Sequence, residues 1–253
     1  MRDFKTIKED LKSIGLKSGD SILIHSSFKS MGYVEGGIQT LIDAIFDVIG
    51  SNGTLLAPTL SYESVTADSP IFDYRNTPSC VGAISEYIRH LDGAKRSIHP
   101  THSCAVIGDK REFFISGHEN DNTPVGKNSP IHKLSLVGGK VLMLGCSLRF
   151  NTSMHGVEEN CGTSYCLAKK PINHTIILED KTYQKEYYRH SIIQNGFAQR
   201  YDRLENVMEL KKETIHGSDS YLIDCETMWK IATETLKKDE FYFVEKVENN
   251  KGA

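Results

Sequence analysis

The sequence lacks a long hydrophobic segment. Its longest nearly unbroken apolar run, residues 141–146, has six residues, whereas a helix needs about 20 to span a bilayer. Three of the first five residues, Met1 to Lys5, are charged, and a polar periodic segment follows them. The apolar region of a signal peptide is therefore missing as well. We predict a cytoplasmic protein that enters no membrane.

Paired cysteines are also missing. The six cysteines form no Cys-x-x-Cys pair, the spacing typical of zinc ribbons and thioredoxin-like redox sites. Three of them, Cys104, Cys146 and Cys225, lie in or beside apolar runs that resemble strands. Thiols in such places are normally reduced and buried in cytoplasmic proteins. We therefore interpret them as core residues.

The charge is nearly balanced. The 253 residues carry 30 basic and 33 acidic side chains, for a net charge of −3, whereas nucleic-acid backbones normally require a basic face. With 39% hydrophobic and 25% charged residues, the composition is that of an ordinary globular protein. Nucleic acid is disfavoured as a partner, and the length allows one large α/β domain or two small ones.

Several common site signatures are absent. The chain has no Gly-x-Gly-x-x-Gly turn, no Gly-x-Ser-x-Gly elbow and no Gln/Arg-x-x-Gly-x-Gly/Ala loop, which binds coenzyme A in the more general acetyltransferase fold. Gly126-Lys127 resembles the end of a phosphate-binding loop but lacks the first glycine. A Ser-x-x-Lys runs from Ser26 to Lys29, without the later motifs of penicillin-recognising enzymes.

Ten histidines raise the question of a metal site. His99 and His102 have the spacing of two ligands, as do His155 and Glu158, but the His-Glu-x-x-His pattern of zinc enzymes is absent. A structural metal held by these groups stays an alternative, and we predict none.

Hydrophobic periodicity alternates between helix and strand. Apolar residues recur at helical spacing over 4–14 and 38–49, and short buried strands are expected at 21–25 and 54–57. Since the second helix connects the two strands, the pattern predicts a parallel pair joined by a right-handed crossover.

The same alternation continues toward the C-terminus. It predicts helices near 79–91, from 129, at 202–212 and around Trp229, with strands near 94–98, 103–107, 140–146, 221–224 and 241–244. Residues 174–179 and 183–190 flank a polar turn and indicate an antiparallel hairpin added to the sheet. No linker or repeat interrupts the chain. We predict a single domain over residues 1–253, with a three-layer α/β/α fold and a mixed, mostly parallel central sheet.

Polar, glycine-rich stretches follow several predicted strands, where open α/β sheets place their ligands. They comprise His25-Ser-Ser with Val34-Glu-Gly-Gly37, Pro58-Thr59, His99-Pro-x-x-Ser103, Gly126-Lys-Asn-Ser-Pro130, Asn151-Thr-Ser-x-His-x-x-Glu158, Tyr201-Asp-x-Leu-Glu205 and Leu222-Ile-Asp224. In this order the runs resemble the antibiotic N-acetyltransferase family, whose best-known members are aminoglycoside 3-N-acetyltransferases. The resemblance covers nearly the whole chain and implies an acetyl-CoA-dependent N-acetyltransferase that acts on a cationic amino sugar.

His155 and Glu158 are the candidate catalytic pair. Acetyl transfer from a thioester needs a base for the attacking amine and a donor for the carbonyl oxygen. Histidine titrates near neutrality, and a carboxylate three residues later on a helix shares its face and orients it. The resemblance places the catalytic pair here, and Thr152 or a backbone N–H is the candidate oxyanion donor. A surface ion pair is the plainer alternative, and a nucleophilic Cys161 or Cys166 is another.

The loop after the first strand is the candidate cofactor site. Coenzyme A carries a pyrophosphate and an arm of amides, so its site needs free N–H groups, hydroxyls and glycines. The resemblance implies that the following residues line the cofactor channel: His25, Ser26, Ser27, Phe28, Gly36, Gly37, His99 and Ser103. The alternative is a turn that only starts a helix.

Three carboxylates are candidates for binding the acceptor. Glu119, Asp121 and Glu159 would hold the ammonium groups of a cationic amino sugar, unless they are simply solvated. An alternative acceptor is a polysaccharide or nucleotide-linked amino sugar, and an alternative function is a non-catalytic module that binds coenzyme A. Assembly into a homo-oligomer stays open.

Overall fold

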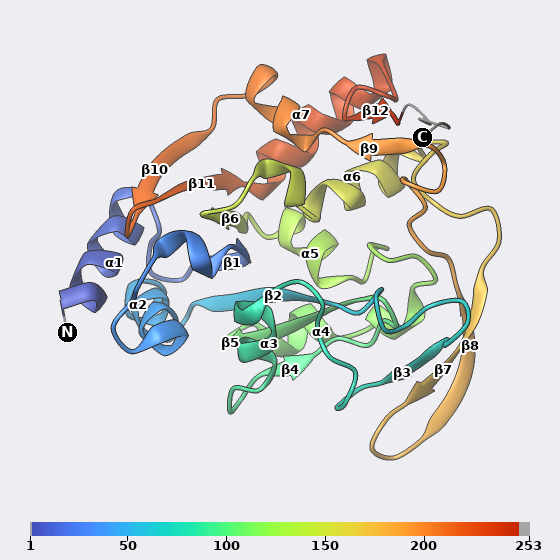
Figure 1. Cartoon of the computed structure of the whole chain (residues 1–253), viewed down its shortest axis with the longest axis horizontal. Helices are drawn as coiled ribbons and strands as arrows, with labels where there is room; N and C mark the ends of the chain where they lie inside the picture. Colours follow the sequence, from blue (N-terminus) through green and yellow to red (C-terminus); the bar gives the residue numbers. More distant parts are fainter. Residues whose placement is uncertain (1, 248–253) are drawn as a thin grey trace, which may run out of the picture.

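The centre of the structure is a seven-stranded sheet. Its strands are Ser21–Ser26 (β1), Thr54–Leu60 (β2), Lys95–Arg96 (β4), His102–Gly108 (β5), Lys140–Leu144 (β6), Lys211–Ile215 (β10) and Ser218–Asp224 (β11). Their order in the sheet is β10-β11-β6-β1-β2-β5-β4. The structure is a computed structural model and describes residues 2–247 (Figure 1).

The sheet is mixed, as the sequence predicts, but it is not mostly parallel. β1 pairs in parallel with β2 and with β6, in agreement with the predicted βαβ unit. The other four pairings are antiparallel, so that part of the prediction is wrong. Short connections explain two of these four pairings: residues 97–101 join β4 to β5, and His216-Gly217 joins β10 to β11. Parallel strands need a far longer crossover.

Side chains of the central strands alternate between two cores, and helices cover both faces. Ile22 and Ile24 of β1 lie in one core, and Leu23 lies in the other. The first core includes α1 (Arg2–Ser13), α2 (Gly37–Ile49) and α3 (Ala83–Arg89); the second includes α4 (Arg111–Ile115), α5 (Pro130–Leu136), α6 (Ser153–Cys161) and α7 (Cys225–Lys238). This is the three-layer arrangement that the sequence predicts. Within residues 2–247, no helix has the length and apolar character needed to cross a membrane.

Two smaller sheets lie outside the central one. One contains β3 (Ile71–Asp73), β7 (Ile172–Ile177) and β8 (Thr182–Tyr187), and the other pairs β9 (Phe197–Gln199) with β12 (Val244–Lys246). The predicted hairpin is present as β7 and β8, but it pairs with β3 at one edge of the molecule and does not extend the central sheet (Figure 1). Its predicted place is therefore wrong.

Residues 201–212 do not form the predicted charged helix. Tyr201–Asn206 is a 3-10 helix (η4), and an edge strand, β10, begins at Lys211. Tyr201 and Leu204 are buried, whereas every residue of β10 except Ile215 is exposed. Edge strands tolerate charged side chains well. Because four of the five residues of β10 are exposed, its sequence does not show the alternation of apolar and polar residues that would distinguish a strand from a helix.

Three parallel strand ends and one helix start meet at the same edge of the central sheet. β1, β2 and β6 run in one direction, so their carboxyl ends lie together. Short 3-10 helices follow two of these strands: η1 (Phe28–Met31) follows β1, and η3 (Leu148–Phe150) follows β6. A third, η2 (His118–Asn120), lies between α4 and α5 in the sequence. Since α6 starts directly after η3, its first turn lies at this edge.

Gly156 allows α6 to pack closely against α7. An added Cβ would lie 2.5 Å from Trp229 Cη2 and 2.7 Å from Val125 Cγ1, well inside the usual contact distance between carbon atoms. The indole cannot easily retreat, because its N–H donates a hydrogen bond to Ser153 Oγ at 2.8 Å. The packing therefore requires glycine at this position.

We predict that Gly156→Ala lowers the free energy of unfolding by about 1–3 kcal/mol through overpacking, although alanine is the better helix former by about 1 kcal/mol. Urea denaturation measures the change. Asn160→Ala, at an exposed position of the same helix, is the matched control and should change stability by less than about 0.5 kcal/mol. Equal midpoints for Gly156→Ala and the wild type would contradict the packing argument.

Candidate active site

A cavity of about 820 Å³ lies at the edge where the parallel strands end. Its walls come from the ends of β1 and β2, the start of β5, the first turn of α6 and the segment after β8. Among the described residues, no Asp or Glu lines it, and the two charged side chains on its walls are Arg149 and Arg189. The cavity is therefore suited to a ligand with polar and anionic groups.

His155 and Glu158 lie on one face of α6 and contact each other. His155 Nδ1 is 3.1 Å from Glu158 Oε2. Glu158 is fully buried, and its carboxylate also accepts hydrogen bonds from Tyr201 Oη at 2.8 Å and from Tyr165 Oη at 3.0 Å. Burial and the nearby Glu158 raise the pKa of both phenols, so they remain protonated donors. These bonds compensate the burial of a carboxylate.

The contacts at Nδ1 orient the imidazole of His155. Nδ1 faces both Glu158 Oε2 and Tyr201 Oη, the latter at 2.9 Å. The network therefore assigns a proton to Nδ1, which donates to the carboxylate, and leaves Nε2 with a lone pair. Because His155 lines the cavity, this arrangement can supply a base to a bound molecule.

Thr152 and His25 both line the cavity and contact each other. Thr152 Oγ1 is 3.3 Å from His25 Nε2. Thr152 is the N-cap residue of α6, yet its side chain makes no capping hydrogen bond. Burial and the neighbouring His155 lower the pKa of His25 to about 3. His25 is therefore neutral at physiological pH and can accept or donate one hydrogen bond at Nε2.

A second histidine–carboxylate pair lies beside the first. His190 Nε2 is 2.6 Å from Glu159 Oε1, and the ring centroids of His190 and His155 are 4.3 Å apart. On its other side, His190 Nδ1 lies 3.1 Å from His102 Nε2. Both His102 and His190 line the cavity. The cavity wall is therefore rich in imidazole groups.

Burial keeps five imidazoles of the protein uncharged, three of them on the cavity wall. Desolvation lowers the pKa of all five, and nearby imidazoles lower it further in all but His118. The five rings belong to His25, His99, His102, His118 and His190. The pKa of His118 falls to about 3. His155 Nδ1 contacts the Glu158 carboxylate, which can stabilise a positive charge on the ring.

The residues predicted to bind the cofactor divide into two groups. Three line the cavity: His25, Ser26 and Ser27. The other five do not line it: Phe28, Gly36, Gly37, His99 and Ser103. Their cofactor role stays a prediction that their position does not support.

Three of the five residues that do not line the cavity have a structural role instead. His99 is fully buried, and its ring centroid is 5.0 Å from that of His118. Ser103 Oγ accepts a hydrogen bond from Arg96 Nε at 2.7 Å. Gly36 has a φ of 79° and caps the start of α2, a backbone conformation that favours glycine. The fold therefore gives these three positions a structural role that does not involve a cofactor.

The predicted acceptor residues are not gathered at the cavity. Asp121 accepts hydrogen bonds from the backbone N–H and Nδ2 of Asn128, at 2.8 and 2.7 Å. The backbone carbonyl of Glu119 accepts one from Lys185 Nζ. Neither residue lines the large cavity or the smaller one described below. Glu159 does not line them either, but it contacts His190, which lines the large cavity.

Several residues at the site were not selected from the sequence. They are Arg149, Arg189, His190, His102 and Tyr201. His102 was considered only as a metal ligand, and Tyr201 only as the start of a matching run. Arg189 and His190 follow the predicted hairpin, and no local pattern marks them, because they reach the site through the tertiary fold.

The structure gives no support to the cysteine or metal alternatives. Cys161 and Cys166 do not line the cavity. Burial raises the pKa of both thiols, and Glu158 raises them further, whereas a nucleophilic cysteine needs a lowered pKa. Within residues 2–247, no three metal-ligating side chains converge on a site for an ion.

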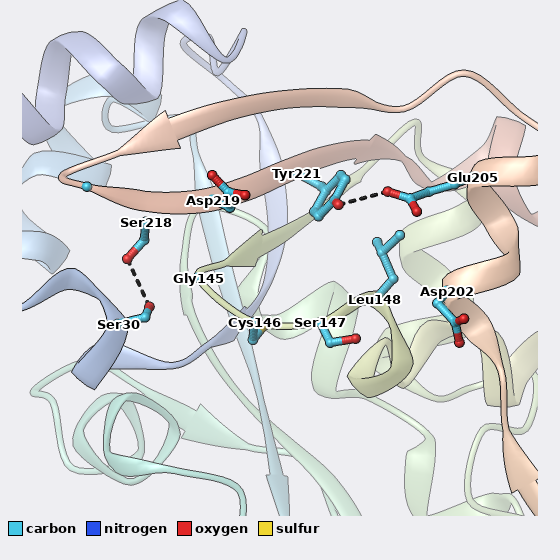
Figure 2. A pocket seen from close by; sticks show the side chains of 11 residues that line it. Ser30, Gly145, Cys146, Ser147, Leu148, Asp202, Glu205, Ser218, Asp219 and Tyr221 are labelled. Atoms are coloured by element: carbon cyan, nitrogen blue, oxygen red, sulfur yellow. Dashed lines mark hydrogen bonds between the residues drawn. The ribbon is translucent and has the colours of Figure 1, made fainter.

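A smaller cavity of about 470 Å³ shares Cys146 with the lining of the first. Figure 2 shows the residues that line the smaller cavity. Its walls carry three carboxylates: Asp202, Glu205 and Asp219. Each has a partner at 2.8 Å, respectively Arg200 Nη2, Tyr221 Oη and Lys212 Nζ. The carboxylates of this cavity are therefore already paired, two with cations and one with a phenol.

Comparison with known proteins identifies relatives. The family model described as aminoglycoside 3-N-acetyltransferase matches residues 23–237. Aminoglycoside N(3)-acetyltransferase VIII of Streptomyces fradiae is 32% identical over 183 residues, which cover 64% of either chain. The chain spans about three fifths of the length of the first curated relatives it matches, 64% and 60%.

Solved structures share the fold. An AAC(3)-IVa aminoglycoside acetyltransferase with a histidine-to-alanine substitution, in complex with gentamicin, is 26% identical and has a TM-score of 0.80, covering 94% of this chain and 89% of its own. AAC-IIIb in a binary complex with CoASH is 24% identical and has a TM-score of 0.78, covering 93% of this chain and 96% of its own.

The neutral buried imidazoles predict a loss of stability in acid. His118 has a folded pKa of about 3, against about 6.5 when unfolded. Between these values the unfolded chain binds a proton that the folded chain excludes, so the free energy of unfolding falls as the pH falls. From pH 7.5 to 5.5 the loss is about 1.4 kcal/mol for each such imidazole. We predict that His118→Gln loses about 1.4 kcal/mol less than the wild type over this interval.

Urea denaturation at the two pH values measures this difference. His90→Gln, at an exposed position, is the matched control and should retain the pH dependence of the wild type. An unchanged pH dependence in His118→Gln would show that His118 has the same pKa in the folded and the unfolded protein.

Proposed function

Because the chain belongs to the aminoglycoside 3-N-acetyltransferase family, we propose that it transfers the acetyl group of acetyl-coenzyme A to an amine of an aminoglycoside or a related amino sugar. The observation that carries the proposal is the His155 imidazole, which lines the cavity and is held by the buried Glu158 carboxylate. The gentamicin complex of a relative with the same fold supports the choice of acceptor class.

The proposed transfer is direct, with both substrates bound together. The acceptor amine attacks the thioester carbonyl carbon, so that a C–N bond forms and the C–S bond breaks. His155 Nε2 removes a proton from the attacking amine and returns it to the departing sulfur, which gives the amide and free coenzyme A. Glu158 lies 3.1 Å from Nδ1 and stabilises the ring while it is positively charged.

Thr152 supports the developing negative charge on the carbonyl oxygen, either through its hydroxyl or through a backbone N–H at the start of α6. The hydroxyl is available because it does not cap the helix. A neutral His25 that carries its proton on Nε2 donates to Thr152 Oγ1 across 3.3 Å. The hydroxyl hydrogen of Thr152 is then free to point at the thioester.

The rest of the cavity suits coenzyme A. Ser26 and Ser27 offer hydroxyls at the end of β1, which fit the amides of the pantetheine arm. Arg149 and Arg189 are the charged side chains on its walls, and the planar guanidinium group binds phosphate oxygens in pairs. We assign these four residues to the cofactor.

One observation favours a second acceptor class. In the described part of the chain, no carboxylate lines the large cavity, and those of the smaller cavity are already paired. A site for a strongly cationic aminoglycoside would be expected to offer free carboxylates. A nucleotide-linked amino sugar carries a single amine together with anionic phosphates, so it is the second candidate.

We predict that His155→Ala lowers kcat for release of free thiol from acetyl-coenzyme A by about 10²–10⁴-fold, because the general base is lost. Calorimetry should show that coenzyme A binds with nearly unchanged affinity. His90→Ala, at an exposed position, is the control and should retain the wild-type rate. A wild-type rate in His155→Ala would overturn the proposed mechanism and leave the activity itself in place.

A screen of acceptors separates the two substrate classes. We expect a higher kcat/KM for thiol release with aminoglycosides than with nucleotide-linked amino sugars at the same concentrations. The reverse order would establish the second candidate. If the protein binds acetyl-coenzyme A but releases no thiol with either class, it is a binding module, and if it binds no acetyl-coenzyme A, the proposed function fails altogether.

A further inference from the structure

Four polar groups form one continuous hydrogen-bonded chain into the cavity. Glu159 Oε1 contacts His190 Nε2 at 2.6 Å, His190 Nδ1 contacts His102 Nε2 at 3.1 Å, and His102 Nδ1 contacts Thr101 Oγ1 at 2.9 Å. Both nitrogens of each ring are therefore engaged. Thr101 is the last member and lines the cavity. The catalytic proposal uses none of these four residues.

The hydrogen bonds of this series of groups can all run from Glu159 toward Thr101 or all run the opposite way. A neutral imidazole has one donor and one acceptor nitrogen, and burial lowers the pKa of both His102 and His190 well below the usual value. Each ring therefore carries one proton, and a donor at one end of the ring requires an acceptor at the other. If His190 accepts from Glu159, then His102 donates to Thr101; if His190 donates to Glu159, then Thr101 donates to His102.

Glu159 can adopt the protonation states that the two directions require. Its side chain is 6% exposed. Burial raises the pKa of its carboxyl to about 7, although hydrogen bonds from Thr123 and the Val125 N–H and the nearby His155 favour the charged form. The carboxyl is therefore protonated below about pH 7 and ionised above it.

Other titratable groups face Glu159 from the elements packed around it. They are His155 on the same helix, His132 on α5, Asp121 after η2, Cys166 after α6 and His190 after β8. Burial lowers the pKa of His132 and raises the pKa of Asp121 and of Cys166. Among these groups, His190 contacts the carboxyl of Glu159 directly.

The backbone explains why a carboxyl group is needed at this point. Glu159 Oε1 also accepts a hydrogen bond from the Val125 N–H at 2.8 Å. The O–H of a carboxylic acid can accept from Val125 and donate to His190 at the same time, and a carboxylate can accept from both. An amide cannot do both, because its NH₂ group has no lone pair for Val125. With glutamine, the oxygen takes the position of Oε1, and only the second direction remains.

From this geometry we infer that Glu159 is a positioning residue that acts through His190 and His102 to set the direction in which the Thr101 hydroxyl points. With Glu159 protonated, His102 donates to Thr101, and the hydroxyl hydrogen is free for a ligand in the cavity. With Glu159 ionised, that hydrogen is committed to His102. One proton in the interior therefore changes Thr101 from a donor into an acceptor.

The consequence for catalysis rests on the proposed function. A hydroxyl that donates into the cavity can bind a carbonyl oxygen of the cofactor or stabilise the developing oxyanion. Thr101 therefore assists acetyl transfer when Glu159 is protonated and does not assist it when Glu159 is ionised. The assistance weakens as the pH rises through about 7.

The direction of the hydrogen bonds from Glu159 to Thr101 can be observed without any substrate. Nitrogen-15 NMR of labelled histidines reports which ring nitrogen carries the proton. In the wild type we expect both His190 and His102 to carry it on Nδ1 at pH 5.5 and on Nε2 at pH 8.5, with a shared midpoint near 7. In Glu159→Gln we expect Nε2–H at both pH values. Glu186→Gln, at an exposed position of β8, is the matched control and should titrate like the wild type.

Wild-type rings that keep the same tautomer over this interval would overturn the inference, and this test does not depend on whether any variant folds. A tautomer change that persists in Glu159→Gln would also overturn it, because another group would then control the chain. Since no acetyl transfer is measured, the result is separate from the fate of the proposed function.

The pH profile of kcat tests the catalytic consequence. The wild type should lose activity above pH 7, whereas Glu159→Gln should be slow at every pH and lack this step. Thr101→Val should lose about 10²-fold in kcat, as on removal of an oxyanion donor, and Thr101→Ser should restore the wild-type profile. If Thr101→Val retains the wild-type profile, Thr101 does not assist transfer.

Discussion

One constraint governs the structure around the cavity: the buried carboxylate of Glu158 must be compensated. An unpaired charge in the interior would cost several kcal/mol. Its partners come from three parts of the chain, namely His155 on α6, Tyr165 after it and Tyr201 at the start of η4. The bond from Tyr201 attaches α6 to a segment 43 residues away in the sequence. This bond also requires Tyr201 to be buried, which gives a reason for the 3-10 helix η4 where the sequence predicts the start of a longer helix.

The part of the site that could be predicted from the sequence is the part formed by local spacing. His155 and Glu158 meet because they are three residues apart on a helix, and Ser26 and Ser27 line the cavity because they end a parallel strand. Arg189 and His190 could not be predicted, because the path of the chain after the β7–β8 hairpin brings them there. Glu119 and Asp121 were predicted at the site but do not line the cavity. A sequence motif identifies a segment, but it does not show which way the side chains of that segment point.

The same distinction holds for the fold. The first βαβ unit and the amphipathic helices follow from periodicity within one segment. The hairpin was predicted as a local structure, but its pairing with β3 depends on a partner about 100 residues earlier in the chain. Two of the four antiparallel pairings follow from short connections, between β4 and β5 and between β10 and β11. The pairings of β2 with β5 and of β6 with β11 join segments far apart in the sequence.

The tight contact at Gly156 links the packing of the second core to the position of His155, the preceding residue. A larger side chain at 156 could be accommodated if the residues at 125 and 229 both became smaller or if α6 moved. Movement of α6 would displace the imidazole, and displacements near 1 Å are costly for catalysis. The position of the candidate base therefore depends on the size of side chains in the second core that never touch a ligand.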